Sequence, residues 1–269
     1  MVTRKSSLHA ISVLLAVVLV LALAPSVNAA DRGMVRDNGV ELYRDGDGGL
    51  HPIVVVGGIQ YVEFPLELIP LKDLKANEKV VIPPPAAGSV SPQTAVTAVS
   101  YSQLYSGWSG TTLGNGPSTI GTDGCYLASA AMMAATYGSQ LEGATTTPLS
   151  LNTWMKNNGG FSGDLLIFGA LVNLPGGVVS SVSYFNDWYS AQLCMYYGYV
   201  PIIKLTRNSY THFCAFVETN GSQSSSTDYI IDPKPAGWSS SYIYGKRQSI
   251  LQAGCSYVSS EIFRVGSRG

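Results

Sequence analysis

The sequence predicts an α+β fold in which helices come first and an antiparallel meander of strands follows. Two observations support this prediction. The run from Cys125 to Tyr137 is small or apolar on every side, which is typical of a helix buried inside a protein. Four strand-like runs follow the last predicted helix, at 199–205, 213–218, 229–231 and 262–265. We therefore expect a central buried helix packed on an antiparallel sheet.

The predicted helices have recognisable ends. Gly138 follows the buried run at the position where glycine commonly ends a helix. A second helix is predicted over 149–157, because Pro148 stands at its first turn. A third is predicted over 187–197, with Asn186 as its N-terminal cap.

The composition excludes several classes of protein. The chain has 269 residues, of which 46% are hydrophobic and 12% charged, so it is not a disordered segment. The 16 Lys and Arg are balanced by 17 Asp and Glu, and the basic excess typical of a nucleic-acid-binding protein is missing. Four cysteines in so long a chain do not make a disulfide-dense miniprotein.

Residues 1–29 are predicted to be a secretory signal peptide. Arg4 and Lys5 precede an apolar stretch over 10–24, and small residues stand before the expected cleavage after Ala29. A retained membrane anchor is the alternative, but the stretch spans only roughly 22 Å as a helix against a hydrocarbon core of about 30 Å. We expect a secreted or extracytoplasmic protein without a membrane span after cleavage.

The rest of the chain divides into three parts by composition. Residues 30–82 have short strand-like runs at 40–43, 53–56 and 59–64, which indicate a small β-rich accessory segment or a pro-segment. The proline-rich stretch 83–97 is predicted to be a stiff linker. Residues 98–269 form the predicted α+β domain.

No metal or cofactor is expected. The glycine-rich stretch 45–49 begins like a calcium-binding loop, but the third oxygen ligand and the acidic residue at the twelfth position are missing. It is therefore interpreted as a hairpin turn. The sequence also has neither a phosphate-binding glycine loop nor a pair of histidines at metal-ligand spacing.

Cys125 is the predicted nucleophile. It stands at the first turn of the buried helix, where the helix dipole and free backbone amides favour an anion such as a thiolate. Gly124 before it permits a close approach of the backbone. The alternative is an ordinary buried cysteine, and pairing among Cys194, Cys214 and Cys255 is left open.

His212 and Asp232 are the predicted partners of this thiol. Their numbers are symmetric about residue 222, in the loop between two strand-like runs, and Asn220-Gly221 in that loop is a tight-turn signal. An antiparallel hairpin would bring the two side chains together at one end of the sheet. A carboxylate beside a histidine orients its ring and stabilises the imidazolium. Upstream, Gln103 is the candidate side-chain donor to an oxyanion.

A set of short motifs surrounds these four residues along the chain. The motifs are Tyr101-Ser102-Gln103; Gly121-Thr122-Asp123-Gly124-Cys125-Tyr126-Leu127 with Ser129-Ala130-Ala131-Met132; Leu151-Asn152-Thr153-Trp154-Met155 with Asn158-Gly159-Gly160-Phe161; Gly198-Tyr199-Val200-Pro201-Ile202-Ile203; Thr211-His212-Phe213; and Ile231-Asp232-Pro233. Their order resembles that of papain-like cysteine peptidases, and more closely the stand-alone peptidase-like branch related to the double-glycine-leader peptidases that process bacteriocins. The resemblance covers about residues 100–265 and leaves 31–99 unmatched.

The resemblance implies a papain-like fold and a role for each residue. Cys125 would be the nucleophile and His212 the general base and then acid. Asp232 would orient the histidine, and Gln103 with the Cys125 amide would hold the oxyanion. The leader peptidases have Asp-Cys-Gly where this chain has Gly124-Cys125-Tyr126, and they are joined to a transporter, so leader processing is not implied.

The expected function is that of an exported thiol hydrolase that cleaves peptide bonds in a peptide or protein substrate. One alternative is an inactive peptide- or cell-surface-binding module, for which Trp108, Trp188 and Trp238 would supply exposed aromatic rings. Another is an amidase or transpeptidase acting on cell-wall peptides, which would use the same residues. The sequence leaves the substrate and the oligomeric state open.

Overall fold

The computed structural model confirms a mixed α+β fold. It describes residues 33–37, 40–44, 50–74, 95–185, 188–219, 225–256 and 263–268. The predicted signal peptide, the turn at 45–49, most of the linker and Asn220-Gly221 lie outside these residues. Within the described part, no helix is both long and apolar enough to cross a membrane.

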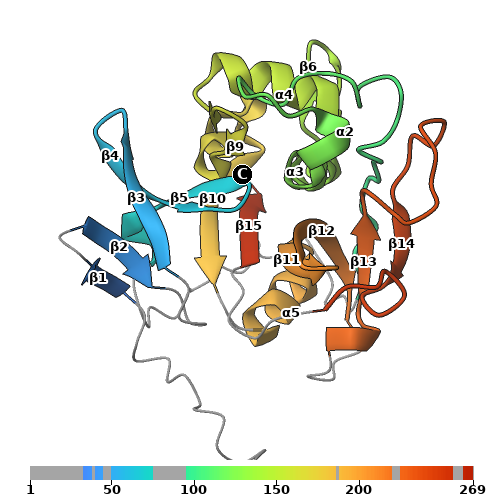
Figure 1. Ribbon diagram of the computed structural model, residues 1–269. Coiled ribbons are helices and arrows are strands. Elements are labelled where there is room, and N and C mark those ends of the chain that lie inside the picture. Colours follow the sequence, from blue (N-terminus) through green and yellow to red (C-terminus); the bar gives the residue numbers. More distant parts are fainter. Residues whose placement is uncertain are drawn as a thin grey trace, which may run out of the picture.

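The N-terminal segment forms an antiparallel sheet of consecutive strands (Figure 1, blue). Its elements are β1 (Gly33–Asp37), β2 (Val40–Arg44), β3 (Leu50–Val56), β4 (Ile59–Phe64), β5 (Glu67–Pro70) and the 3-10 helix η2 (Leu71–Leu74). Strand β5 continues the sheet into the C-terminal part, because Glu67 pairs in parallel with Leu166 of β9 (Leu165–Leu166), which pairs in turn with β8 (Phe161–Ser162). The two parts of the chain thus share one sheet.

Three helices form the upper layer in Figure 1. They are α2 (Ile120–Asp123), α3 (Cys125–Thr136) and α4 (Pro148–Asn157), with short hairpin strands β6 (Gln140–Leu141) and β7 (Ala144–Thr145) between the last two. The predicted buried helix is α3, in which every residue from Cys125 to Ala135 is buried. The sequence analysis did not predict α2, a single capped turn that begins after Thr119.

The second sheet has the strand order β10-β15-β11-β12-β13-β14. Its strands are β10 (Val179–Phe185), β11 (Ile202–Arg207), β12 (Tyr210–Glu218), β13 (Tyr229–Asp232), β14 (Lys246–Ser249) and β15 (Phe263–Arg268). The expected meander is present from β11 to β13, in which each strand pairs antiparallel with the next. The fourth predicted run, 262–265, corresponds to β15, which lies between β10 and β11 and not after β13; β10 and β14 were not predicted. The other elements are α5 (Trp188–Tyr196) and the 3-10 helices η3 (Phe168–Asn173), η4 (Pro175–Gly177) and η5 (Ser225–Thr227).

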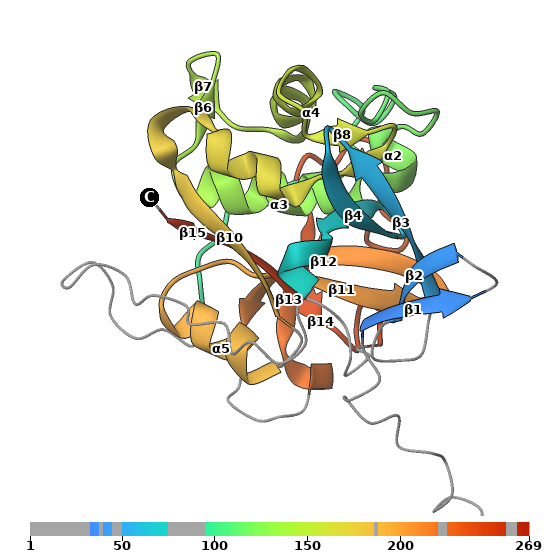
Figure 2. The same ribbon diagram turned by 90° about the vertical axis from the view of Figure 1, so that its left-hand side faces the viewer.

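Helices cover both faces of this sheet, with α3 on one side and α5 on the other (Figure 2). Alternate residues of β12 pack against the two layers: Phe213 belongs to the core cluster of α3, and Phe216 to that of α5. A strand that is buried on both faces has an almost continuous run of apolar residues in its sequence, and β12 has such a run from Phe213 to Val217. The sheet therefore fixes the start of β12 next to the first turn of α3.

Candidate active site

Stacked aromatic rings fix the position of Cys125 relative to β12. The ring of Tyr126 stacks on Phe213, with centroids 4.3 Å apart and planes 13° apart. One turn further along α3, the Ser129 hydroxyl donates to the Phe213 carbonyl at 3.2 Å. Because Cys125 precedes Tyr126 and His212 precedes Phe213, these contacts bring the thiol and the imidazole to one place.

Gly124 joins α2 to α3 directly before the thiol. A Cβ atom on Gly124 would overlap the carbonyl oxygen of Ile120. The Gly124 amide donates to that same oxygen at 3.0 Å. The close approach that the sequence suggested for this glycine is therefore present, and a larger residue would push α2 away from the start of α3.

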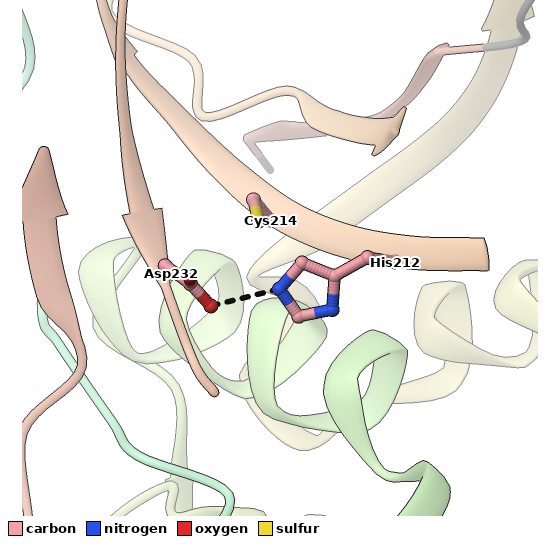
Figure 3. A group of neighbouring side chains, drawn as sticks. All are labelled: His212, Cys214 and Asp232. Atoms are coloured by element: carbon pink, nitrogen blue, oxygen red, sulfur yellow. Dashed lines mark hydrogen bonds and ion pairs between the residues drawn. The ribbon is translucent and has the colours of Figure 1, made fainter. Parts of the chain in front are cut away.

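His212 and Asp232 form a direct hydrogen bond, and Figure 3 shows their side chains pointing toward each other. The His212 Nε2 atom lies 2.7 Å from the Asp232 Oδ1 atom. The strand register differs from the expected one. Ala215 pairs with Ile231, so one further step places Asp232 opposite Cys214 and not opposite His212. The two side chains meet along the diagonal between neighbouring strands, which is within reach of a histidine.

The Asp232 carboxylate is fully buried and accepts four hydrogen bonds. Oδ1 accepts from His212 Nε2 and from the Lys234 amide, both at 2.7 Å. Oδ2 accepts from Arg207 Nη1 at 2.9 Å and from Gln248 Nε2 at 3.1 Å. Burial alone would raise the pKa of Asp232, but these bonds and the charges of His212 and Arg207 outweigh it, so the pKa is lowered. The carboxylate is held ionised and in one orientation.

The pKa of His212 reflects contacts on both sides of its ring. Burial lowers this pKa, but side-chain hydrogen bonding to Asp232 and to Cys125, together with the charges of both, raises it to about 9. Since Nε2 faces Asp232, Nδ1 is the ring nitrogen left for the Cys125 side. The arrangement favours a proton on the imidazole and a negative charge on Asp232.

Cys125 and His212 lie on the wall of one cavity of about 640 Å³. Each of the two residues is only 4% exposed, so the reacting atoms are largely shielded from water. The hairpin turn from Arg207 to Tyr210 forms one side of the cavity, and Lys234 lies at its edge. The Lys234 ammonium donates to the Thr122 carbonyl at 2.8 Å, which ties the Asp232 loop to the end of α2.

Gln103 reaches the same cavity, as the sequence analysis expected, and is fully buried. Its Nε2 atom donates to carbonyl oxygens of the first two residues of α2, at 3.2 Å from Ile120 and 3.1 Å from Gly121. Among the described residues, its Oε1 atom is buried without a hydrogen-bond partner. In this state the amide nitrogen supports the approach to Cys125 and is not free to serve an oxyanion.

Sequence reasoning missed Arg207 and Gln248, the two donors to Asp232 Oδ2. Arg207 also donates to the Lys234 carbonyl at 2.9 Å, so one guanidinium bridges both ends of the Asp232 loop. Gln248 belongs to β14, a strand that was not predicted. A charged residue directly before a hairpin turn carries no signal of its own, and only the folded sheet brings Arg207 to the carboxylate.

His212, Cys214 and Asp232 also form a possible metal-binding group, since one ligand atom of each lies within 4.8 Å of the others. Figure 3 draws this group, with Cys214 further along β12 than His212. The residues do not suit a cation as they stand. Both Asp232 oxygens are already hydrogen-bonded, one of them to the positive Arg207, and burial raises the pKa of the Cys214 thiol well above its usual value.

All four cysteines lie within the described residues, all are buried, and none of them forms a disulfide. Cys194, Cys214 and Cys255 belong to the core cluster on the α5 side. Burial, assisted by the charge of Asp232, raises the pKa of Cys255 to about 12. Of the four, Cys125 lies on the wall of the cavity beside the histidine.

The expectation that Trp108 presents an exposed ring is wrong. Its side chain is 5% exposed and packs against Tyr101 and Tyr105, with centroids 5.9 Å and 4.8 Å away. Its indole nitrogen donates to the Ser102 carbonyl at 2.8 Å. Trp108 therefore supports the segment that carries Gln103 and offers no binding surface.

The site thus combines a thiol and a histidine of raised pKa on the wall of one cavity with a buried carboxylate that orients the histidine from behind. Such a group can transfer a proton to and from a sulfur nucleophile. Comparison of the chain with protein-family models, with curated proteins and with solved structures gave no match. The geometry of the site is therefore the evidence from which its chemistry must be inferred.

Proposed function

We propose that this protein is a thiol hydrolase of the papain-like type that cleaves peptide bonds. The observation that supports it most is the position of His212, which bonds to Asp232 through Nε2 and interacts with Cys125 on its other side. A nucleophile, a base and a group that orients the base are the parts of an acyl-transfer triad. The central helix with the cysteine and the sheet with the histidine also fit the papain-like arrangement.

In the proposed reaction, His212 holds the proton that Cys125 gives up, and the thiolate attacks the carbonyl carbon of the substrate. His212 then donates that proton to the leaving amine as the carbon–nitrogen bond breaks, which leaves an acyl group on the sulfur. A water molecule gives a proton to His212 and attacks the acyl carbon, which releases the acid and restores the thiol. Asp232 stays ionised throughout and stabilises the imidazolium.

Gln103 and the backbone amide of Cys125 are the proposed donors to the oxyanion. The Gln103 amide nitrogen would turn from the carbonyls of Ile120 and Gly121 toward the substrate oxygen as that oxygen gains charge. The Gln103 Oε1 atom has no hydrogen-bond partner among the described residues, so hydrogen bonds fix the present orientation of the amide through its nitrogen alone. The predicted signal peptide over 1–29 supports an activity outside the cytoplasm.

Cleavage of a peptide library by the wild type and by Cys125→Ala tests the proposal. We expect products with new amino termini from the wild type and none from the variant. Cys194→Ala is the matched control, because it removes another buried thiol on the opposite side of the sheet. Cleavage that survives in Cys125→Ala, or a wild type that cleaves no member of the library, contradicts the proposal. Cell-wall peptides and an added amine acceptor belong in the library, because the same triad could serve amide cleavage or transpeptidation.

A further inference from the structure

The wall of the catalytic cavity contains two residues from the N-terminal segment. Pro65 and Leu66, in the turn between β4 and β5, line the same cavity as Cys125 and His212. The other lining residues come from the C-terminal part of the chain. A segment that precedes the whole α+β domain in sequence thus reaches the reacting atoms.

Leu66 is held in an unfavourable backbone conformation. Its φ angle is +69°, in the left-handed region, where the Cβ atom of a non-glycine residue crowds its own backbone. The Leu166 amide donates to the Leu66 carbonyl at 3.2 Å, and the neighbouring Glu67 pairs with Leu166. Strain of this kind persists where the surroundings determine the conformation, and it is concentrated at functional sites.

Packing on both sides of the turn keeps it in place. Before the turn, Phe64 is 3% exposed, and the Lys204 ammonium lies 5.9 Å from its ring centroid. After it, Ile69 is fully buried and belongs to the same core cluster as Phe168 and Tyr126. The residues on either side of the turn therefore belong to the main core, while Leu66 is half-buried against that core and Pro65 is exposed.

We propose that Leu66 determines specificity by forming an apolar subsite next to the scissile bond. This inference rests on the proposed peptide-bond hydrolysis. The cavity remains open beside the turn, so Pro65 and Leu66 bound it without filling it. The subsite selects substrates with a large apolar side chain, because burying such a side chain against Leu66 favours them roughly tenfold over polar ones. The N-terminal segment is thus a working part of the enzyme.

Leu66→Gly tests this inference with little risk to folding. Glycine adopts a positive φ without strain, so the variant loses the side chain while its backbone is relieved. The measured quantity is the ratio of kcat/KM for two peptides that differ by Leu or Ser at one position near the cleaved bond. We expect this ratio to fall about tenfold in Leu66→Gly.

Glu142→Gly is the matched control, because Glu142 also has a positive φ, of +55°, and lines a different pocket. It should leave the ratio unchanged. If Leu66→Gly does not fold, Leu66→Asn replaces it, since asparagine tolerates the left-handed region.

An unchanged ratio in a folded Leu66 variant overturns the subsite. An equal rise in kcat/KM for both peptides also overturns it, and indicates a segment that blocks the site. A wild type that cleaves neither these peptides nor the library overturns the proposed function itself, and the subsite with it. The wild-type control thus separates the two failures.

Discussion

The ring of Tyr126 stacks on that of Phe213 at 4.3 Å, and each ring is one residue beyond a member of the proposed triad. Cys125 and His212 therefore owe their proximity to an apolar contact behind them. The stack belongs to the core between α3 and the sheet. Because interiors are close-packed, a change in this contact should shift the relative positions of thiol and imidazole.

Phe213→Leu should lower both stability and turnover. We expect the free energy of unfolding to fall by about 1–2 kcal/mol, since part of a buried side chain and its stacking are lost. We expect kcat to fall about tenfold or more, because small displacements of reacting groups are costly. Urea unfolding and steady-state kinetics measure the two effects.

Phe216→Leu is the control for this prediction, because Phe216 is equally buried on the same strand but packs on the α5 side. It should destabilise the protein by a similar amount and leave kcat near the wild-type value. Equal losses of kcat in the two variants would show that the stack has no special role in positioning the site.

Arg207→Met should impair the orientation of Asp232. The variant removes one of the four hydrogen-bond donors to the Asp232 carboxylate. Among the described residues, Arg207 and His212 are the two whose side chains form an ion pair with this carboxylate, so only His212 would remain. The pKa of Asp232 should rise toward its usual value, so the acidic limb of the kcat/KM profile should move to higher pH. A pH–rate profile from about pH 3 to about pH 8 checks this.

Arg207→Lys keeps the positive charge, but a lysine ammonium lacks the two separate nitrogens with which the guanidinium donates to Asp232 and to the Lys234 carbonyl. We expect partial recovery of the wild-type profile. Arg247→Met is the matched control, because Arg247 is ion-paired to Glu218 on the exposed side of β14. An acidic limb that stays in place in Arg207→Met would argue against this role for the guanidinium.

The stability of the protein should decrease between about pH 6.5 and pH 9 because of His212. Its pKa is about 9 in the folded state against a usual value of 6.5, so the folded state binds this proton more tightly. The contribution of His212 to the free energy of unfolding is complete below about pH 6.5. It is lost as the pH rises through 9, and the total loss is up to about 3 kcal/mol. Asp232 acts in the opposite direction: its lowered pKa contributes stability that is lost as the pH falls below its usual 3.8.

Urea unfolding of the wild type and of His212→Gln checks the alkaline part. The difference between their unfolding free energies should shrink as the pH rises from about 6 to about 9.5. A difference that stays constant across this range would show that His212 does not carry a raised pKa in the folded protein.

Iodoacetamide should modify Cys125 and leave the other three thiols intact near neutral pH. Cys194 and Cys214 are fully buried, and burial raises the pKa of Cys255 to about 12. His212→Ala should slow the reaction, because it removes the proposed base that takes up the proton of the Cys125 thiol. Peptide mapping by mass spectrometry identifies the modified site, and equal labelling of Cys255 in the folded protein would contradict the prediction.

Much of the local structure could be predicted from the sequence. The buried helix that begins at Cys125, the helix that begins at Pro148 and the meander from β11 to β13 follow from periodicity, glycine and proline. These signals act over a few residues and hold in almost any tertiary context. The proximity of His212 and Asp232 could also be predicted, since the sequence indicates a hairpin between the two strands that carry them.

The details of the site depended on contacts between distant segments. The register of β12 and β13 is displaced from the symmetric one, and it shifts again between Phe216 and Glu218. Register follows from which side chains are buried on each face, and β12 is buried on both, so alternation along the strand gave no guidance. Trp108 was placed wrongly for a different reason: its partners Tyr101 and Tyr105 are close in sequence, but an irregular loop folds the ring back onto them, and such a loop has no periodic pattern that reveals burial.

The sequence by itself determined the chemical types at the site: one thiol at a helix start, one histidine and one carboxylate on adjacent strands. Only the tertiary structure decided that Arg207 and Gln248 hold Asp232, that Gln103 faces the first two residues of α2, and that Leu66 bounds the cavity. The physical reason is one of range. Helix and strand propensities are local, whereas burial, charge pairing and cavity walls arise from segments brought together by a common core.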